Sequence, residues 1–212
     1  MSPFPVILSA PSGGGKSAIA KGLLERRTDV GYSVSCTTRQ PRAGEVDGRE
    51  YYFYSVGEFL VARDRGEFAE WAEVHGRLYG TLKREMERVM SAGRHVLMDI
   101  DVQGAAQLRT AYPDAVQVFV LPPSASVLVG RLTARRTENA GTLLTRLTSA
   151  LAELRAVETY DYVVVNDDLS RAVGTVSGII DAESAKRHRV RDLEEQLSAL
   201  IQQLEHEIAK RS

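Results

Sequence analysis

Eight consecutive residues near the amino terminus have the composition of a phosphate-binding loop. The run is Ala10-Pro11-Ser12-Gly13-Gly14-Gly15-Lys16-Ser17, and it directly follows a short apolar stretch. Glycines let backbone N–H groups turn toward one anion, and a helix that starts after them adds its positive end. Lys16 would reach the β- and γ-phosphates, and the Ser17 hydroxyl would bind Mg²⁺. Ala10 stands where the general pattern has glycine, and the loop still predicts a nucleoside-triphosphate site.

Two aspartates could bring oxygen atoms to the same place. Asp99 ends the apolar run 95–99 and Asp101 follows two residues later, so both would project beyond a buried strand on one face. In an open α/β sheet, ligands gather at the carboxyl ends of the strands. One division of roles gives magnesium-bound water to Asp99, and a substrate base or a phosphate-binding arginine to Asp101. The alternative for Asp101 is a cap on the following helix.

These residues require strands that end, and helices that begin, at one edge of a sheet. Short apolar runs predict buried strands over Pro5–Ser9, His95–Asp99, Val116–Leu121 and Tyr162–Val165. Each is followed by a stretch that we interpret as a helix, over Ser17–Arg27, Val102–Thr110, Ser124–Leu132 and Leu169–Ile180. Strands that alternate with helices predict an α/β fold, with a parallel sheet flanked by helices on both faces.

Residues 32–93 interrupt this alternation. Tyr32–Thr38 and Glu50–Tyr54 alternate like antiparallel strands around a polar loop, so we expect an inserted α+β subdomain. A second polar stretch, Thr133–Gly141, is rich in arginine and lies between helices, which predicts a mobile surface flap. A single domain would then have its core over about 1–31 and 94–185, and a small lid over about 133–147.

The carboxyl-terminal segment, about 183–212, has the pattern of one long amphipathic helix. Its apolar stripe follows 3-4-3-4 spacing through Val190, Leu193, Leu197, Leu200 and Leu204. The helix could fold back onto its own domain, or it could join subunits of a homodimer or higher homo-oligomer. We favour the subunit contact, because the stripe lies past the last core element.

The overall composition excludes several classes of protein. The chain has 212 residues, 43% of them hydrophobic and 26% charged, with a net charge of −1, which argues against a general nucleic-acid or anionic-membrane binder. No apolar stretch approaches the ~18 residues of a membrane span, and no secretory leader is recognisable. Cys36 is the single cysteine, which fits a reducing compartment. We therefore expect a cytoplasmic protein with neither a nucleic-acid nor a membrane partner.

Further motifs resemble those of guanylate kinases, in that family's order and roughly its spacing. They are VSCTTRQPRAGEVDG at 34–48, EWAEVHG at 70–76, YGT at 79–81, DIDVQG at 99–104 and VVNDD at 164–168. The resemblance covers about residues 5–185. It implies a P-loop kinase core with a GMP-binding subdomain and a lid. It also implies a reaction in which ATP, with Mg²⁺, phosphorylates GMP, and dGMP as well, in purine nucleotide metabolism.

The resemblance assigns two groups of residues to the acceptor nucleotide. Those that would hold its phosphate are Arg39, Arg42, Tyr51 and Tyr79, and those that would hold guanine are Ser35, Glu70, Thr81 and Asp101. Guanidinium forks suit a dianionic phosphate, and a carboxylate can accept both adjacent donors of guanine, N1–H and N2–H₂. From the residues alone, Arg39 and Arg42 could equally form a solvated loop, Tyr51 could be a cross-strand aromatic, and Glu70 an exposed glutamate.

Arginines of the lid are implied to neutralise charge on the transferred phosphoryl group. The residues that the resemblance makes catalytic are Lys16, Arg39, Asp99, Arg131, Arg135 and Arg146, with Arg136 beside them. Asn166 resembles the residue near the adenine of ATP. The family has glycines where this chain has Ala134 and Arg136, and an arginine where it has Thr145, so a stiffer lid or an altered hinge would follow.

Two other functions are compatible with parts of this pattern. One is a non-catalytic module of guanylate-kinase type that binds a protein partner; the complete phosphate loop and the lid arginines argue against it. The other is a P-loop kinase of a different phosphorylated acceptor, such as a ribosyl phosphonate. The base-reading residues argue against the second, because such an acceptor lacks the donors of guanine.

Overall fold

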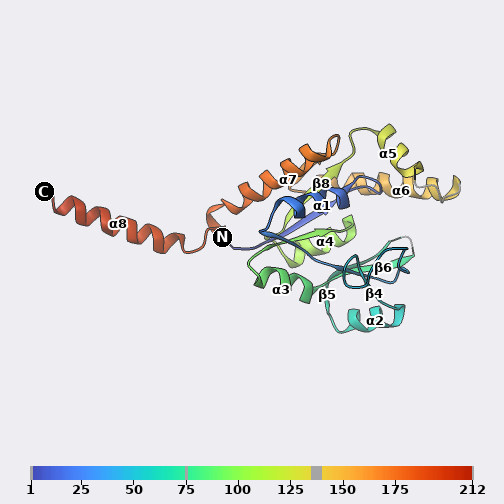
Figure 1. Cartoon of the computed structure of the whole chain (residues 1–212), viewed down its shortest axis with the longest axis horizontal. Helices are drawn as coiled ribbons and strands as arrows, with labels where there is room; N and C mark the ends of the chain where they lie inside the picture. The colour runs from blue at the N-terminus through green and yellow to red at the C-terminus, as the bar shows by residue number, and fades with distance from the viewer. Residues whose placement is uncertain (1, 75, 135–139, 212) are drawn as a thin grey trace.

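The computed structural model describes residues 2–74, 76–134 and 140–211. Its larger layer is a parallel sheet (Figure 1). Within these residues five strands form it, in the order β2-β7-β1-β8-β9. Their bounds are β1 Pro5–Ser9, β2 Val30–Tyr32, β7 His95–Asp99, β8 Val116–Leu121 and β9 Tyr162–Val165. Each pairing among them is parallel. The four strands expected from the apolar runs, and the α/β class, are therefore confirmed.

Helices cover both faces of this sheet, because alternate side chains of a buried strand point to opposite sides. The bounds are α1 Lys16–Arg26, α3 Lys83–Ser91, α4 Val102–Ala111 and α7 Leu169–Ser184. On one face Leu8 packs in a cluster with Ile19 of α1 and Val176 of α7. On the other face Ile7 packs in a cluster with Met86 of α3. Figure 1 shows the strands between these two pairs of helices.

A smaller sheet forms a second layer, in the order β4-β3-β6-β5. Its bounds are β3 Ser35–Thr37, β4 Tyr52–Phe53, β5 Phe68–Val74 and β6 Arg77–Leu82, and α2, Val56–Asp64, accompanies it. Its own core contains Cys36, Phe59, Phe68 and Leu82. The rings of Phe59 and Phe68 stack with centroids 4.4 Å apart, which joins α2 to β5.

The pairing expected for the first strands of this segment is wrong. Tyr32 pairs in parallel with Leu97 in the larger sheet, and only Ser35–Thr37 crosses to the smaller one. In place of Glu50–Tyr54, the strand is Tyr52–Phe53, and it runs parallel to β3. Side-chain alternation indicates a strand but not its partner, so one continuous pattern concealed the passage between two sheets.

Two helices border the lid expected over about 133–147: α5, Ala125–Thr133, ends where it begins, and α6, Ala140–Arg155, starts within it and continues to a 3₁₀ turn, Ala156–Thr159, that leads to β9. The helices pack through a small cluster that includes Leu128, Leu132 and Ala150. Arg135 and Arg136, and with them much of the expected flap, lie outside the described residues.

The single helix expected over about 183–212 is wrong, because a buried arginine holds a turn in its middle. α7 ends at Ser184, and after a 3₁₀ turn α8 spans Leu193–Ala209. Arg189, in the turn, is 7% exposed. It lies 3.2 Å from a carboxylate oxygen of Glu183 and 4.0 Å from the ring centre of Phe4. These contacts hold the turn against the body of the domain, and α8 begins beyond the turn.

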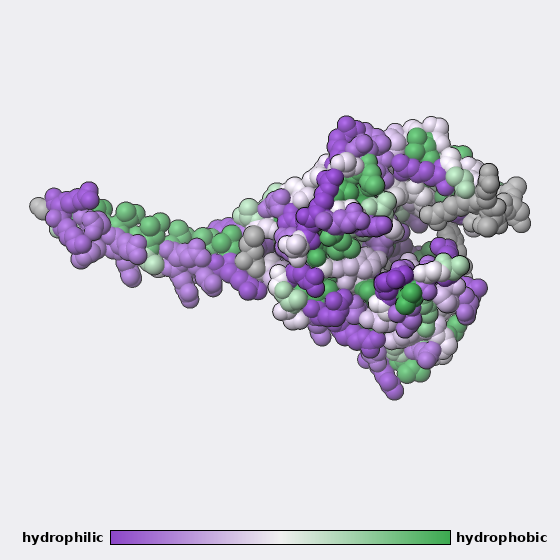
Figure 2. Space-filling model, in the orientation of Figure 1, coloured by the Kyte–Doolittle hydropathy of each residue, from purple (hydrophilic) through white to green (hydrophobic). Residues whose placement is uncertain are grey.

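Helix α8 projects from the body and does not fold back onto its own domain (Figure 1). Its apolar stripe is exposed, and Figure 2 shows it as a hydrophobic band along the projecting helix. The exposed fraction rises from 46% at Leu197 to 66% at Ile208. No helix of the described part of the chain is both long and apolar enough to cross a bilayer.

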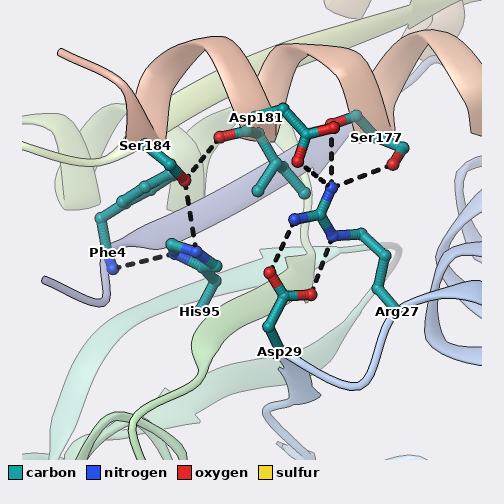
Figure 3. A network of polar contacts seen from close by, with 8 residues as sticks. Phe4, Arg27, Asp29, His95, Ser177, Asp181 and Ser184 are labelled. Carbon is teal, nitrogen blue, oxygen red and sulfur yellow. Dashed lines mark hydrogen bonds and ion pairs between the residues drawn. The ribbon is translucent and has the colours of Figure 1, made fainter. Parts of the chain in front are cut away.

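A polar network joins the elements at the amino ends of the parallel strands (Figure 3). Arg27, just after α1, donates to Asp29 at 2.6 Å and to Asp181 of α7 at 2.5 Å. Beside it, the N–H of Phe4 donates to Nδ1 of His95 at 3.4 Å. The network therefore holds together the edge of the sheet that is opposite the carboxyl ends.

Candidate active site

The phosphate-loop residues form a tight turn between β1 and α1. Gly15 has a φ of 95°, a conformation that glycine adopts readily. The N–H of Gly14 donates to the Pro11 carbonyl at 2.7 Å. A Cβ atom on Gly15 would lie 2.2 Å from Nδ2 of Asn166, so the close approach also requires glycine. Because α1 begins at Lys16, its first N–H groups have no partner within the helix and can bind an anion.

Asn166, just after β9, and Arg131 of α5 support this loop through its backbone. Nδ2 of Asn166 donates to the Gly14 carbonyl at 2.9 Å. Arg131 of α5 donates to the same carbonyl at 3.3 Å and to the Asn166 carbonyl at 3.2 Å. Both residues therefore contact the backbone of the loop, and the roles expected for them, Asn166 near adenine and Arg131 on the transferred phosphoryl group, stay predictions.

Helix α6 contacts the loop at Ser12 with two charged side chains. Glu153 accepts the Ser12 N–H at 2.9 Å through Oε2. Arg146, which is 7% exposed, donates to Ser12 Oγ at 3.2 Å. Glu153 was missed by the sequence analysis, because an acidic residue within an amphipathic helix gives no local signal of a distant contact.

Asp99 forms a small cluster of oxygen atoms at the end of β7. Its Oδ2 accepts from Ser17 Oγ at 2.5 Å, and its Oδ1 accepts from the hydroxyl of Tyr32. Burial and the charge of Asp99 raise the pKa of Tyr32 well above its usual value, so this hydroxyl stays a donor. Tyr32 is a second residue that the sequence analysis missed, since it was interpreted as part of a strand only.

The donors around Asp99 fit a magnesium ion. Mg²⁺ prefers hard oxygen ligands, and it commonly takes one or two from protein and the others from phosphates and water. Ser17 and Asp99 offer a hydroxyl and a carboxylate beside the phosphate loop. No cluster of three or more His, Cys, Asp or Glu ligands occurs among the residues with described positions.

Glu70 is a buried carboxylate in the smaller sheet. It is 5% exposed, and Thr81 Oγ1 donates to its Oε1 at 2.7 Å. Burial raises the pKa of Glu70 to about 7; the Thr81 hydroxyl opposes this shift and the charge of Asp101 adds to it. An exposed glutamate, the alternative from sequence alone, is therefore wrong at this position.

The docking of α4 on β5 determines where Glu70 lies. Gln107 of α4 donates to the Trp71 carbonyl at 2.7 Å and accepts from its N–H at 3.2 Å. A Cβ atom on Gly104 would lie 2.3 Å from Oε2 of Glu70, so only glycine leaves room for the carboxylate. Asp101 caps the same helix, where its Oδ1 accepts the Gly104 N–H at 2.8 Å. The capping role kept as the alternative for Asp101 is thus present, at a position that still lines the cavity.

The residues expected at the acceptor phosphate are brought together only in part. Arg39 forms a bidentate ion pair with Glu45, in which both N–O distances are 2.9 Å. Its Cζ atom lies 5.2 Å from the ring centre of Tyr51. The rings of Tyr51 and Tyr79 are 6.0 Å apart. Arg42 lies exposed on the turn, where its backbone N–H donates to Glu45 at 2.7 Å. The solvated-loop alternative therefore describes Arg42 better than Arg39.

One cavity joins the two halves of the site. Residues from the phosphate loop, from the carboxyl end of β7 and from the smaller sheet all line it, and they include Ala10, Ser12, Lys16, Ser35, Tyr51, Glu70, Tyr79, Asp99, Asp101 and Glu153. Thr81 is connected to the cavity by its hydrogen bond to Glu70. The arrangement can therefore hold an anion at the loop and a polar ring system against Glu70 within a single space.

Comparisons with known proteins identify relatives over most of the chain. A family model described as guanylate kinase matches residues 2–183. A guanylate kinase of Aromatoleum aromaticum is 49% identical over 177 residues, which are 84% of this chain and 87% of that protein. One of Symbiobacterium thermophilum is 48% identical over 184 residues, or 87% of each chain. The crystal structure of guanylate kinase from Anaplasma phagocytophilum is similar with a TM-score of 0.78 at 35% identity, covering 93% of this chain and 95% of that one.

Proposed function

The chain belongs to the guanylate kinase family, and on that premise we propose how its residues divide the work of transferring a phosphoryl group from ATP to GMP. The reaction itself, ATP + GMP to ADP + GDP, is the one that its relatives and its fold support. The observation that carries the proposal is the cavity in which Lys16 of the phosphate loop and the buried Glu70 both take part. The two alternative functions have no support among the relatives.

Glu70 and Thr81 read the base in this proposal. As a carboxylate, Glu70 accepts from N1–H and N2–H₂ of guanine together, while Thr81 Oγ1 donates to Oε1 and holds the carboxylate in place. Ser35 and Asp101 line the same cavity and complete the set. Adenine offers no such pair of adjacent donors, so it would leave a buried carboxylate unpaired, which is a strong basis for rejection.

The phosphate loop and Asp99 hold the donor. Lys16 contacts the β- and γ-phosphates, and the backbone donors of residues 13–17 surround them. Ser17 and Asp99 would hold Mg²⁺, Asp99 through bound water, with Tyr32 fixing the carboxylate. When bound, Mg²⁺ neutralises charge on the phosphate oxygens.

Arginines complete the site around the transferred group. Arg39 would exchange its ion pair with Glu45 for the GMP phosphate, beside Tyr51 and Tyr79. Arg42 would join from the exposed turn. Arg131, Arg135 and Arg146 would neutralise the phosphoryl group on its way, and Asn166 would lie near adenine. Because the acceptor is already an anion, positioning and charge stabilisation suffice, and no strong general base is needed.

A coupled assay of ADP release tests this function directly. The purified chain is given ATP and Mg²⁺ with GMP, dGMP, AMP, UMP or CMP at equal concentration. We expect strong turnover with GMP, and dGMP as a second acceptor. The Glu70→Gln variant should lose GMP turnover while its ATP affinity is unchanged. Equal turnover of AMP and GMP would refute the base-reading role.

We further propose that α8 joins two copies of the chain. Its exposed stripe, from Leu197 to Ile208, is complementary to itself when two helices pair in opposite directions. That direction sets Glu194 and Glu195 at one end of α8 beside Lys210 and Arg211 of the second copy. The cytoplasmic location expected from the composition stays a prediction.

A further inference from the structure

Glu153 makes an unusual contact for an acidic side chain beside a phosphate site. It lies on α6, the helix that starts within the expected lid, 141 residues from Ser12 of the loop that it contacts. Its Oε2 accepts the backbone N–H of Ser12 at 2.9 Å. Hydrogen bonds from a backbone N–H to a carboxylate are about twice as strong as neutral ones. The loop is therefore held by a charged group at the residue just before its glycines.

The same face of α6 carries a second contact to the same residue. Arg146 precedes Glu153 by seven residues, which is two helical turns, and its guanidinium donates to Ser12 Oγ at 3.2 Å. The backbone and the side chain of Ser12 are thus both held by one helix. Any displacement of α6 must move Ser12, break these bonds, or both.

The contact is placed where it can affect the donor phosphates. Ser12 precedes Gly13, Gly14 and Gly15 in the turn, and Glu153 lines the same cavity as Lys16. Glycines give the loop many conformations in the absence of restraint. A fixed Ser12 N–H restricts the backbone at the entrance of the turn, so the donors that follow are oriented before the nucleotide arrives.

We propose that Glu153 is a positioning residue that holds the phosphate loop in its anion-binding conformation and ties it to the lid helix α6. The proposal rests on the assignment of the loop to ATP. It adds a residue outside the loop on which ATP affinity depends, while the GMP subdomain is unaffected. It also makes Ser12 the point at which the lid helix and the loop move together.

The test compares three variants with the wild-type protein. Glu153→Ala removes the acceptor, Glu153→Gln keeps an amide oxygen that can accept the Ser12 N–H, and Glu158→Ala is a control at an exposed glutamate nearby. Calorimetry measures the binding of β,γ-imido-ATP with Mg²⁺ in the absence of GMP, and separately the binding of GMP alone. Steady-state kinetics then give kcat and the two KM values, and thermal melting reports folding.

We expect Glu153→Ala to weaken binding of the ATP analogue about tenfold, as loss of a charge-assisted hydrogen bond would, with GMP binding changed less than about twofold. Glu153→Gln should recover most of the loss, and Glu158→Ala should match the wild type. Unchanged or tighter binding of the analogue by Glu153→Ala would overturn the proposal, tighter binding meaning that the carboxylate competes with phosphate. A lower melting temperature with both affinities unchanged would also overturn it, since the role would then be structural only.

Failure of the proposed function would look different. If the wild-type protein bound the ATP analogue but did not phosphorylate GMP, the acceptor assignment would fail. The effect of Glu153→Ala on binding of the analogue would still be measurable and would still decide the role of Glu153.

Discussion

At the scale of single residues, the role proposed for the buried acid Glu70 predicts that recognition of GMP depends on pH. Guanine needs the carboxylate form, whereas burial raises the pKa of this group to about 7. Below that pH, binding must first remove a proton, so the GMP dissociation constant should rise by up to about tenfold per pH unit. Above pH 8 it should level off. Calorimetric titration with GMP between pH 5.5 and 8.5 measures this dependence.

The comparison with Glu70→Gln isolates the part that belongs to Glu70, because the phosphate of GMP also titrates, near pH ~6. The variant should bind GMP more weakly and retain only the phosphate's contribution. If the wild type and the variant followed the same pH curve, Glu70 would not be the group that loses the proton.

Tyr32 gives a second prediction at this scale. Removing its hydroxyl leaves one carboxylate oxygen of Asp99 without its donor, while Ser17 keeps the other. We expect Tyr32→Phe to weaken binding of Mg²⁺ and ATP together by about fivefold, since one hydrogen bond to a charged group is lost. Binding of GMP should not change. Titration of the binding of β,γ-imido-ATP against Mg²⁺ concentration checks this.

Tyr162→Phe is the matched control. Its hydroxyl also donates to a buried carboxylate, Oε1 of Glu183 at 2.5 Å, but on β9 and away from the phosphate loop. An equal loss of Mg²⁺ dependence in both variants would show that Tyr32 acts only through general stability.

The site residues differ in how far the sequence could predict them. The phosphate loop was predictable because its chemistry depends on a contiguous run, and Asp99 because the end of a parallel strand is a known position for ligands. Glu153 and Tyr32 were not, because each acts through a residue far along the chain. The burial of Glu70 was equally invisible, since it depends on how α4 docks on β5 at Gly104.

At the scale of elements, His95 joins the N-terminal segment to β7 and α7. Nδ1 of His95 accepts the N–H of Phe4, and Ser184 Oγ lies 3.5 Å from Nε2, so the neutral ring fits its surroundings (Figure 3). Burial lowers the pKa of His95 from 6.5, an effect that Arg27 and Arg189 reinforce and Asp29 opposes. The unfolded chain therefore binds the proton more readily than the folded one.

Stability should consequently decrease as pH falls through 6.5, the ordinary pKa that the unfolded state retains. The loss is at most about 1.4 kcal/mol per pH unit for one group and ends at the folded-state pKa. Urea unfolding at pH 7.5 and 5.5 measures it. His95→Asn, whose Oδ1 can still accept the Phe4 N–H, should show a smaller difference between the two pH values, and an equal difference would exclude His95 as the cause.

The elements themselves show why sequence patterns succeed and fail. Buried parallel strands are continuous apolar runs, so Pro5–Ser9 and His95–Asp99 were predicted to the residue. The passage of the chain between two sheets after Tyr32 was not, because alternation is the same in either sheet. The break before α8 was not predicted either, since it depends on the ion pair of Arg189 with Glu183 and not on a local breaker.

At the scale of the whole molecule, the exposed apolar stripe of α8 predicts that two copies of the chain associate. Ending the chain after Arg191 keeps the turn held by Arg189 and removes the exposed stripe. We expect light scattering to report a monomer for this truncated chain and a larger assembly for the full chain, with equal GMP turnover per subunit. Leu200→Glu should have the same effect as truncation, and Gln202→Glu, on the polar side, should not. A full chain that is already monomeric would refute pairing through α8.

The position of α8 also determines how two paired copies would behave. It leaves the body near Phe4 and Arg189, at the amino ends of the strands (Figure 1), whereas the cavity of the candidate site lies at the phosphate loop and Asp99, at the carboxyl ends. The subunits would be joined at their far ends, with neither lid near the interface. No shared element would carry a signal between the two catalytic centres. The rate of such an assembly should depend hyperbolically on the concentration of each substrate, because the two active sites would work independently and without cooperativity.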